Sequence, residues 1–190
     1  MKQPFSALWE KRGRLFIAAV AMALVFAVGM SVQASREAAR RETRFQDDLQ
    51  NFGSQVRLLS ADVDNLRRQA GESPGDPMER YVIQNDLAVI RRNAASFPDM
   101  AHLPQFSQYP NARLYLTHLE FALLGGSCAD VEDLSRVVTI CQPLLDARPG
   151  GPLEETMAIL EENILSGDYQ DALDLLGIDD PISITTQGGT

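Results

Sequence analysis

Reactive side chains are few in this chain, and they are not grouped as catalytic or metal-binding sets require. The two histidines, His102 and His118, have no cysteine, histidine or carboxylate at ligand spacing beside them. His118 and Glu120 would point to different faces of a helix, so they do not form a zinc motif. A buried histidine or one that caps a helix is therefore the favoured interpretation of both.

The carboxylates are not paired in the way that acid–base catalysis needs. Four glutamates in one segment are expected to form a solvated helix face, namely Glu154, Glu155, Glu161 and Glu162. The sequence has no phosphate-cradling glycine loop and no nucleophile elbow. We therefore predict a protein that is not an enzyme, with no catalytic residues, no bound metal and no cofactor.

Two cysteines, Cys128 and Cys141, would form a disulfide in an oxidising compartment if their backbones approached. A helix over 129–145 would instead place them about 20 Å apart, whereas a disulfide needs Cα atoms within roughly 7 Å. A bridge would require a broken helix, with Pro143 as the place for the break. The alternative is that both thiols are buried as small apolar groups.

The longest uncharged stretch, Leu15 to Met30, follows Lys2, Lys11, Arg12 and Arg14. As a helix, residues 15–32 would cover roughly 27 Å, against a bilayer hydrocarbon core of about 30 Å. We predict a transmembrane helix over 15–32 after a leader of residues 1–14. The alternative is a signal peptide cleaved after Ala34, since Val32-Gln33-Ala34 has the small residues that such a site uses.

Basic residues flank the apolar stretch on both sides, because Arg36, Arg40, Arg41 and Arg44 follow it. The leader is short, and long C-terminal domains cross a membrane largely regardless of charge. We therefore expect a cytoplasmic N-terminus and a large domain in the periplasm of a bacterium. The partners would be the lipid bilayer and proteins of the cell envelope.

The net charge of −9 argues against nucleic acid as a partner, because phosphates attract a basic surface. The chain beyond the apolar stretch is long enough for one modest domain and an extended element. Its supply of Ala, Leu, Arg, Glu and Asp favours an all-α fold.

Apolar residues then recur in alternating steps of four and three within a predicted stem over 33–70. The six that form the regular seam, and our candidate interaction residues, are Leu49, Phe52, Val56, Leu59, Val63 and Leu66. Val at a and Leu at d favour a parallel dimer, in which Asp62 and Arg67 would pair between chains. The alternative is one long helix that packs its apolar stripe on the chain's own C-terminal domain.

A helical domain is predicted over 76–178, after a break at 71–75. Asp76 and Pro77 form a helix start, and Gly125-Gly126 ends the strongest helix. Helices are expected over 76–95, 111–124, 130–146, 153–165 and 169–176, with an apolar proline-rich loop over 97–110 held against the core or a partner. The tail, 179–190, is expected to fray.

The stretch Gly167-Asp168-Tyr169-Gln170-Asp171-Ala172-Leu173 resembles the turn between the paired helices of a tetratricopeptide repeat. In that family, a glycine opens the turn and a small alanine lets the helices approach. A fainter copy lies at Leu123-Leu124-Gly125-Gly126. Asn163 departs from the family, which has a large aromatic there. The resemblance implies a small domain of helical hairpins, and the alternative is two ordinary hairpins.

Two classes of function are consistent with these features. The first is a non-enzymatic membrane-anchored scaffold or assembly subunit of an envelope complex, and its plan resembles that of tetratricopeptide proteins tethered by one helix. The second is a periplasmic domain that binds a small ligand or senses a partner, released if the signal peptide is cleaved. The first class needs no chemistry and is our prediction.

Overall fold

The computed structural model is all-helical over the residues that it describes, which are 5–68, 76–125, 130–179 and 181–182, with side chains from residue 20 on. No strand occurs among these residues. The chain divides into two compact units, Met1–Thr43 and Arg44–Thr190. The predicted all-α class is therefore confirmed.

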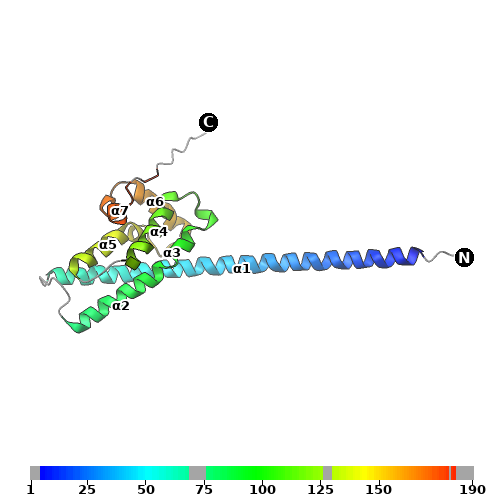
Figure 1. Ribbon diagram of the computed structural model, residues 1–190, viewed down its shortest axis with the longest axis horizontal. Helices are drawn as coiled ribbons and strands as arrows, with labels where there is room; N and C mark the ends of the chain where they lie inside the picture. The colour runs from blue at the N-terminus through cyan, green and yellow to red at the C-terminus, as the bar shows by residue number, and fades with distance from the viewer. Residues whose placement is uncertain (1–4, 69–75, 126–129, 180, 183–190) are drawn as a thin grey trace, which may run out of the picture. The chain divides into compact units, whose positions relative to one another are not determined.

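Helix α1 runs without interruption from Phe5 to Arg68 and passes from unit 1 into unit 2 (Figure 1). Gly29 does not end it, and neither does Ala34. Within the described residues, no helix is both long enough and apolar enough to cross a membrane. The first five residues of the predicted span, 15–19, lie outside the described side chains.

The C-terminal part of α1 lies inside unit 2 and supplies one wall of its core. Helix α2, Pro77–Ala94, begins at the predicted cap, where the Asp76 carboxylate accepts a hydrogen bond from the Met78 amide at 2.9 Å. The contacts described below show that α2 runs antiparallel to α1. Residues of α1 from Arg44 on therefore belong to the same compact unit as the helices that follow.

The proline-rich stretch forms two short helices, α3 (Phe97–Ala101) and η1 (Pro104–Phe106), where a loop was predicted. Proline lacks a backbone N–H, and the N–H groups in the first turn of a helix have no partner within that helix. The prolines near the start of α3 and η1 are therefore compatible with these helices. Phe97, Met100 and Phe106 are fully buried. The segment is held against the core, as its apolar side chains predicted.

Helix α4, Pro110–Gly125, is central because it packs against α2, α3 and the three helices that follow. These are α5 (Val131–Asp146), α6 (Leu153–Leu165) and α7 (Gln170–Leu176). Helix α5 continues through Pro143 without a break. The core joins all these helices to the second part of α1.

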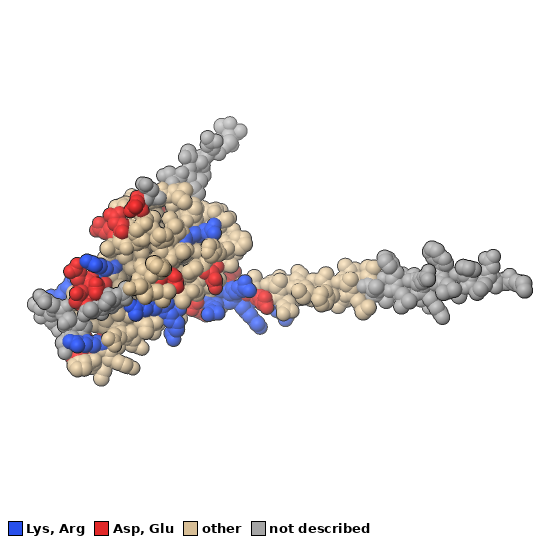
Figure 2. All heavy atoms as spheres, in the orientation of Figure 1, with Lys and Arg blue, Asp and Glu red and all other residues tan. Residues whose placement is uncertain are grey.

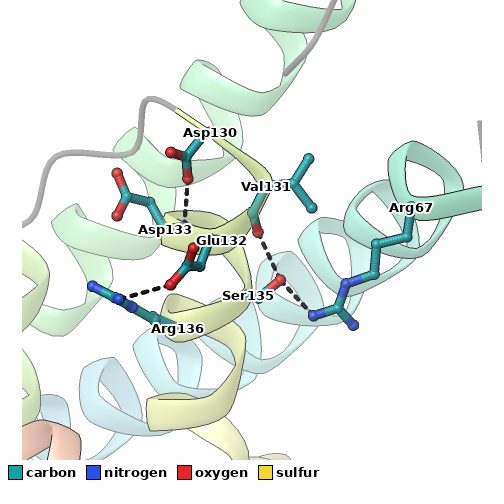
Figure 3. Close-up of polar contacts among 7 residues, drawn as sticks. All are labelled: Arg67, Asp130, Val131, Glu132, Asp133, Ser135 and Arg136. Carbon is teal, nitrogen blue, oxygen red and sulfur yellow. Dashed lines mark hydrogen bonds and ion pairs between the residues drawn. The ribbon is translucent and has the colours of Figure 1, made fainter. Parts of the chain in front are cut away.

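The end of α1 is attached to the start of α5 by a polar contact (Figure 3). Arg67 donates a hydrogen bond to the Ser135 hydroxyl at 2.7 Å, and that hydroxyl donates to the Val131 carbonyl at 2.6 Å. Asp130 caps α5 by accepting from the Asp133 amide at 2.9 Å. Arg67 therefore has a hydrogen-bond partner within its own chain.

Candidate functional site

The six candidate interaction residues of the stem are buried within their own chain. Leu49, Phe52, Val56, Leu59, Val63 and Leu66 are each at most 3 % exposed. The Phe52 ring meets that of Phe97 edge to face, with 5.0 Å between centroids. The seam is thus part of the core of unit 2, which is the arrangement of the intramolecular alternative. An apolar stripe specifies that one face is covered but not what covers it.

Gly53, within α1, is a site of close approach between segments. A Cβ atom at this position would lie 2.7 Å from Cγ of Pro149 and 3.8 Å from a methyl of Leu145. The absence of a side chain lets α1 pack closely against the end of α5 and the residues after it. Gly53 is therefore explained by packing inside the domain.

Cys141 is a free thiol, fully buried in α5. Burial raises its pKa well above the ordinary value of a thiol, so it stays protonated and unreactive at neutral pH. The pKa of Tyr115 is likewise raised, first by burial and then by Cys141, and its hydroxyl donates to the Ile140 carbonyl. Cys128 lies outside the described residues, and the proposed bridge between the two cysteines is not tested.

The histidines take part in contacts between helices. Nδ1 of His118 lies 3.0 Å from the Leu176 carbonyl, which can only accept, so the ring donates and caps the end of α7. His102 lies 3.5 Å from the Arg113 guanidinium. Among the described residues, no group of three His, Cys, Asp or Glu side chains is placed to hold a metal ion.

A polar cluster that the sequence did not reveal holds the C-terminal segment. Asn111, almost fully buried, accepts from the Ile182 amide at 2.6 Å and donates to the Ile182 carbonyl at 3.0 Å. Glu161 accepts from the Asn111 side chain and from the Ala112 amide, both at 2.7 Å. Ile178 is also buried. The described part of the predicted fraying tail is thus attached to the domain.

A second cluster lies between α1 and α2. The charge of Asp62 on α1 acts on Asp86 of α2, and Phe52, earlier in α1, contacts Phe97, just after the end of α2, so the two helices run antiparallel. Asp86 is 8 % exposed, and burial together with the Asp62 charge raises its pKa. On the same two helices, Oε1 of Gln55 and Nδ2 of Asn93 are buried and have no hydrogen-bond partner among the described residues. The only other such atom in the described part of the chain is Nε of Arg113 on α4, and buried polar atoms are normally paired.

The exposed apolar part of α1 is the strongest candidate for a functional surface. Every residue from Val20 to Val32 is exposed, and the large apolar ones are 43–74 % exposed. No charged side chain interrupts this segment, which is tan in Figure 2. Soluble proteins rarely expose an apolar surface of this extent, and such a surface marks contact with a membrane or another protein.

Comparison with known proteins adds no relative. No family model matches the chain, no curated protein is similar enough to match it, and no solved structure matches it. The site is accordingly interpreted from its own residues.

Proposed function

We propose that this protein is a non-enzymatic, single-span protein of a bacterial inner membrane. Residues 15–32 would form the anchor, and the helical domain would act in the periplasm as a scaffold or assembly subunit of an envelope complex. The observation that carries the proposal is the exposure of every apolar residue from Val20 to Val32. A helix that is apolar on all sides is stable when lipid or protein surrounds it.

Continuity of α1 favours a retained anchor over a cleaved signal peptide. A cleaved signal would be separated from the mature chain near Ala34, yet α1 continues through Gly29 and Ala34 to Arg68. Residues 44–68 of the same helix form part of the core of unit 2. The anchor and the first helical segment of the domain would thus belong to the same continuous helix.

The role as an interaction module is supported by the organisation of unit 2. Its reactive groups are occupied by structural contacts: His118 caps α7, Cys141 is buried, and Glu161 orients Asn111. The Tyr169 hydroxyl donates to Asp146 of α5 at 2.9 Å, and Ala172 is buried in α7, which packs against α5 and α4. The sequence from Gly167 to Leu173 resembles the turn of a tetratricopeptide repeat, and that resemblance supports a role in protein binding.

Fractionation and topology in a bacterial host test the proposal. The full-length chain should remain with membranes after extraction at alkaline pH, at its full mass. Alkaline phosphatase fused to the C-terminus should be active, whereas a reporter that works only in the cytoplasm should not. A chain shortened near Ala34, or one released by alkaline extraction, would contradict the retained anchor, and an inactive phosphatase would contradict the orientation.

A further inference from the structure

Two arginines on α1 directly follow the exposed apolar segment. Arg36 and Arg40 are exposed, and neither forms an ion pair or a side-chain hydrogen bond with another described residue. The next arginine on the same stripe, Arg44, lies 3.9 Å from Asp48 and belongs to unit 2. The two arginines are therefore cations of unit 1 without an internal partner among the described residues.

Arg36 lies at the depth of the headgroup layer of a bilayer, and Arg40 lies one helical turn farther out. Residues four apart on a helix differ by about 40° in direction, so Arg36 and Arg40 share one stripe. They lie about 6 Å and 12 Å along the helix axis beyond Val32, the last large apolar residue. The headgroup region on each side of a bilayer is about 5–8 Å deep. Helical side chains lean toward the N-terminus, so both arginines lean back toward the apolar segment.

The acidic residues nearby do not neutralise the stripe formed by Arg36 and Arg40. Glu42 points to the opposite side of the helix from Arg40, as the helical period requires. Glu37 lies beside the stripe and forms no ion pair with Arg36 or Arg40. In the proposed orientation, basic residues beyond the span work against translocation, so membrane topology does not explain them.

We propose that Arg36 and Arg40 bind the phosphate groups of anionic phospholipids where α1 leaves the bilayer. A guanidinium presents a planar pair of donors that matches two phosphate oxygens. Anionic lipid also attracts basic residues next to a span through the surface potential. The inference rests on the proposed membrane anchor and adds the chemical class of lipid that surrounds its outer end.

Lipid selectivity of the full-length chain tests the inference. The protein is reconstituted in phosphatidylcholine vesicles, and spin-labelled phosphatidylglycerol is compared with spin-labelled phosphatidylcholine at the protein surface. The wild type should prefer the anionic lipid, and Arg36→Gln/Arg40→Gln should lower this preference about twofold or more. The preference that the arginines supply should disappear in 1 M salt, where the screening length is about 3 Å.

Two matched variants separate this stripe from other charges. Arg57→Gln/Arg92→Gln removes two exposed arginines from unit 2 and should leave the preference unchanged. Lys11→Gln/Arg12→Gln/Arg14→Gln removes leader charges and should leave the contribution of Arg36 and Arg40 in place. The inference would be overturned if the unit 2 variant lost as much preference for the anionic lipid as Arg36→Gln/Arg40→Gln. It would also be overturned if Arg36→Gln/Arg40→Gln lost none of that preference.

Retention in the vesicles is measured in the same samples. A wild-type chain that alkaline extraction removes from the vesicles would refute the anchor, and the lipid inference with it. A retained chain whose selectivity is insensitive to Arg36 and Arg40 would refute only the lipid inference. The two failures are thus distinguishable.

Discussion

At the scale of single residues, Asp86 is a buried carboxylate whose charge opposes folding. Its carboxylate lies in the α1–α2 interface with Asp62 nearby, and the pKa of Asp86 is raised by burial first and by that charge second. A raised pKa means that the folded state holds its proton more tightly than the unfolded state. Asp86 therefore opposes folding above its folded pKa, and this cost is relieved as the pH falls toward its ordinary pKa.

We expect Asp86→Asn to stabilise the domain at pH 7. Removal of the charge removes its burial cost, so the advantage over the wild type should shrink as the pH is lowered toward 4. Urea unfolding of both proteins at several pH values measures this difference. Asp171→Asn, at an exposed residue of α7, is the control and should show no comparable trend. An Asp86 variant less stable than the wild type at pH 7 would contradict the argument.

Gly53 gives a second prediction at this scale. Alanine favours a helix over glycine by about 1 kcal/mol, but a Cβ only 2.7 Å from Pro149 Cγ forces a shift whose typical cost is about 1–3 kcal/mol. Gly53→Ala should therefore destabilise the domain by about 1 kcal/mol in chemical unfolding. In a Pro149→Ala background the same change should be neutral or stabilising. Equal effects in the two backgrounds would show that the contact with Pro149 is not the cause.

Cys141 should not react with thiol reagents in the folded protein. Its thiol is fully buried and its pKa is raised by that burial, so little thiolate forms and reagents cannot reach it. In a Cys128→Ser variant, which leaves Cys141 as the single thiol, labelling should be absent in buffer and complete in urea. Rapid labelling in buffer would contradict the burial of Cys141.

At the scale of elements, the seam of α1 should govern stability and not self-association. Leu59 is buried in the core, whereas its neighbour Leu58 is 53 % exposed. We expect Leu59→Ala to cost about 2–5 kcal/mol in unfolding experiments, and Leu58→Ala to change stability by less than about 0.5 kcal/mol.

Sedimentation of the soluble domain provides the decisive comparison for the seam. Its mass should be that of a monomer in the wild type and in both variants. A wild-type dimer that dissociates on Leu59→Ala would restore the coiled-coil interpretation.

The sequence predicted the positions of the helices better than it predicted which segments pack against each of them. Periodicity and caps located five of the described helices after α1, namely α2, α4, α5, α6 and α7, including the Asp76 cap and the central α4. The same periodicity could not choose between a dimer and an intramolecular core, because both cover one face of α1. The Asn111–Ile182 contacts join residues 71 apart. Such long-range polar contacts leave no local pattern in a sequence.

At the scale of the whole molecule, the boundary between the units falls inside a helix. Residues 20–44 of α1 are exposed, whereas Phe45 begins the buried stripe. The sequence predicted the all-α class. A continuous helix carries no linker composition at Arg44, so no local pattern marks the division between the units there.

This boundary predicts opposite effects of one substitution in two forms of the chain. In the intact helix, Thr43 lies mid-helix and its hydroxyl donates to the Ala39 carbonyl at 3.0 Å. Alanine is the better helix former at such an exposed position, so Thr43→Ala should be neutral or slightly stabilising in the full-length protein. In a fragment of residues 42–190, Thr43 instead precedes the first turn, and Gln46 three residues later completes a capping box.

Loss of that cap should therefore destabilise the fragment by about 1 kcal/mol. Chemical unfolding, followed by circular dichroism in the same mild detergent for both forms, measures the two changes. Glu42→Ala, beside the cap but without its hydroxyl, is the control and should not reproduce the contrast. If the fragment does not fold, the division at Arg44 is wrong, because unit 2 would then depend on unit 1. If it folds but Thr43→Ala has the same effect in both forms, the α1 of the fragment does not begin at Thr43.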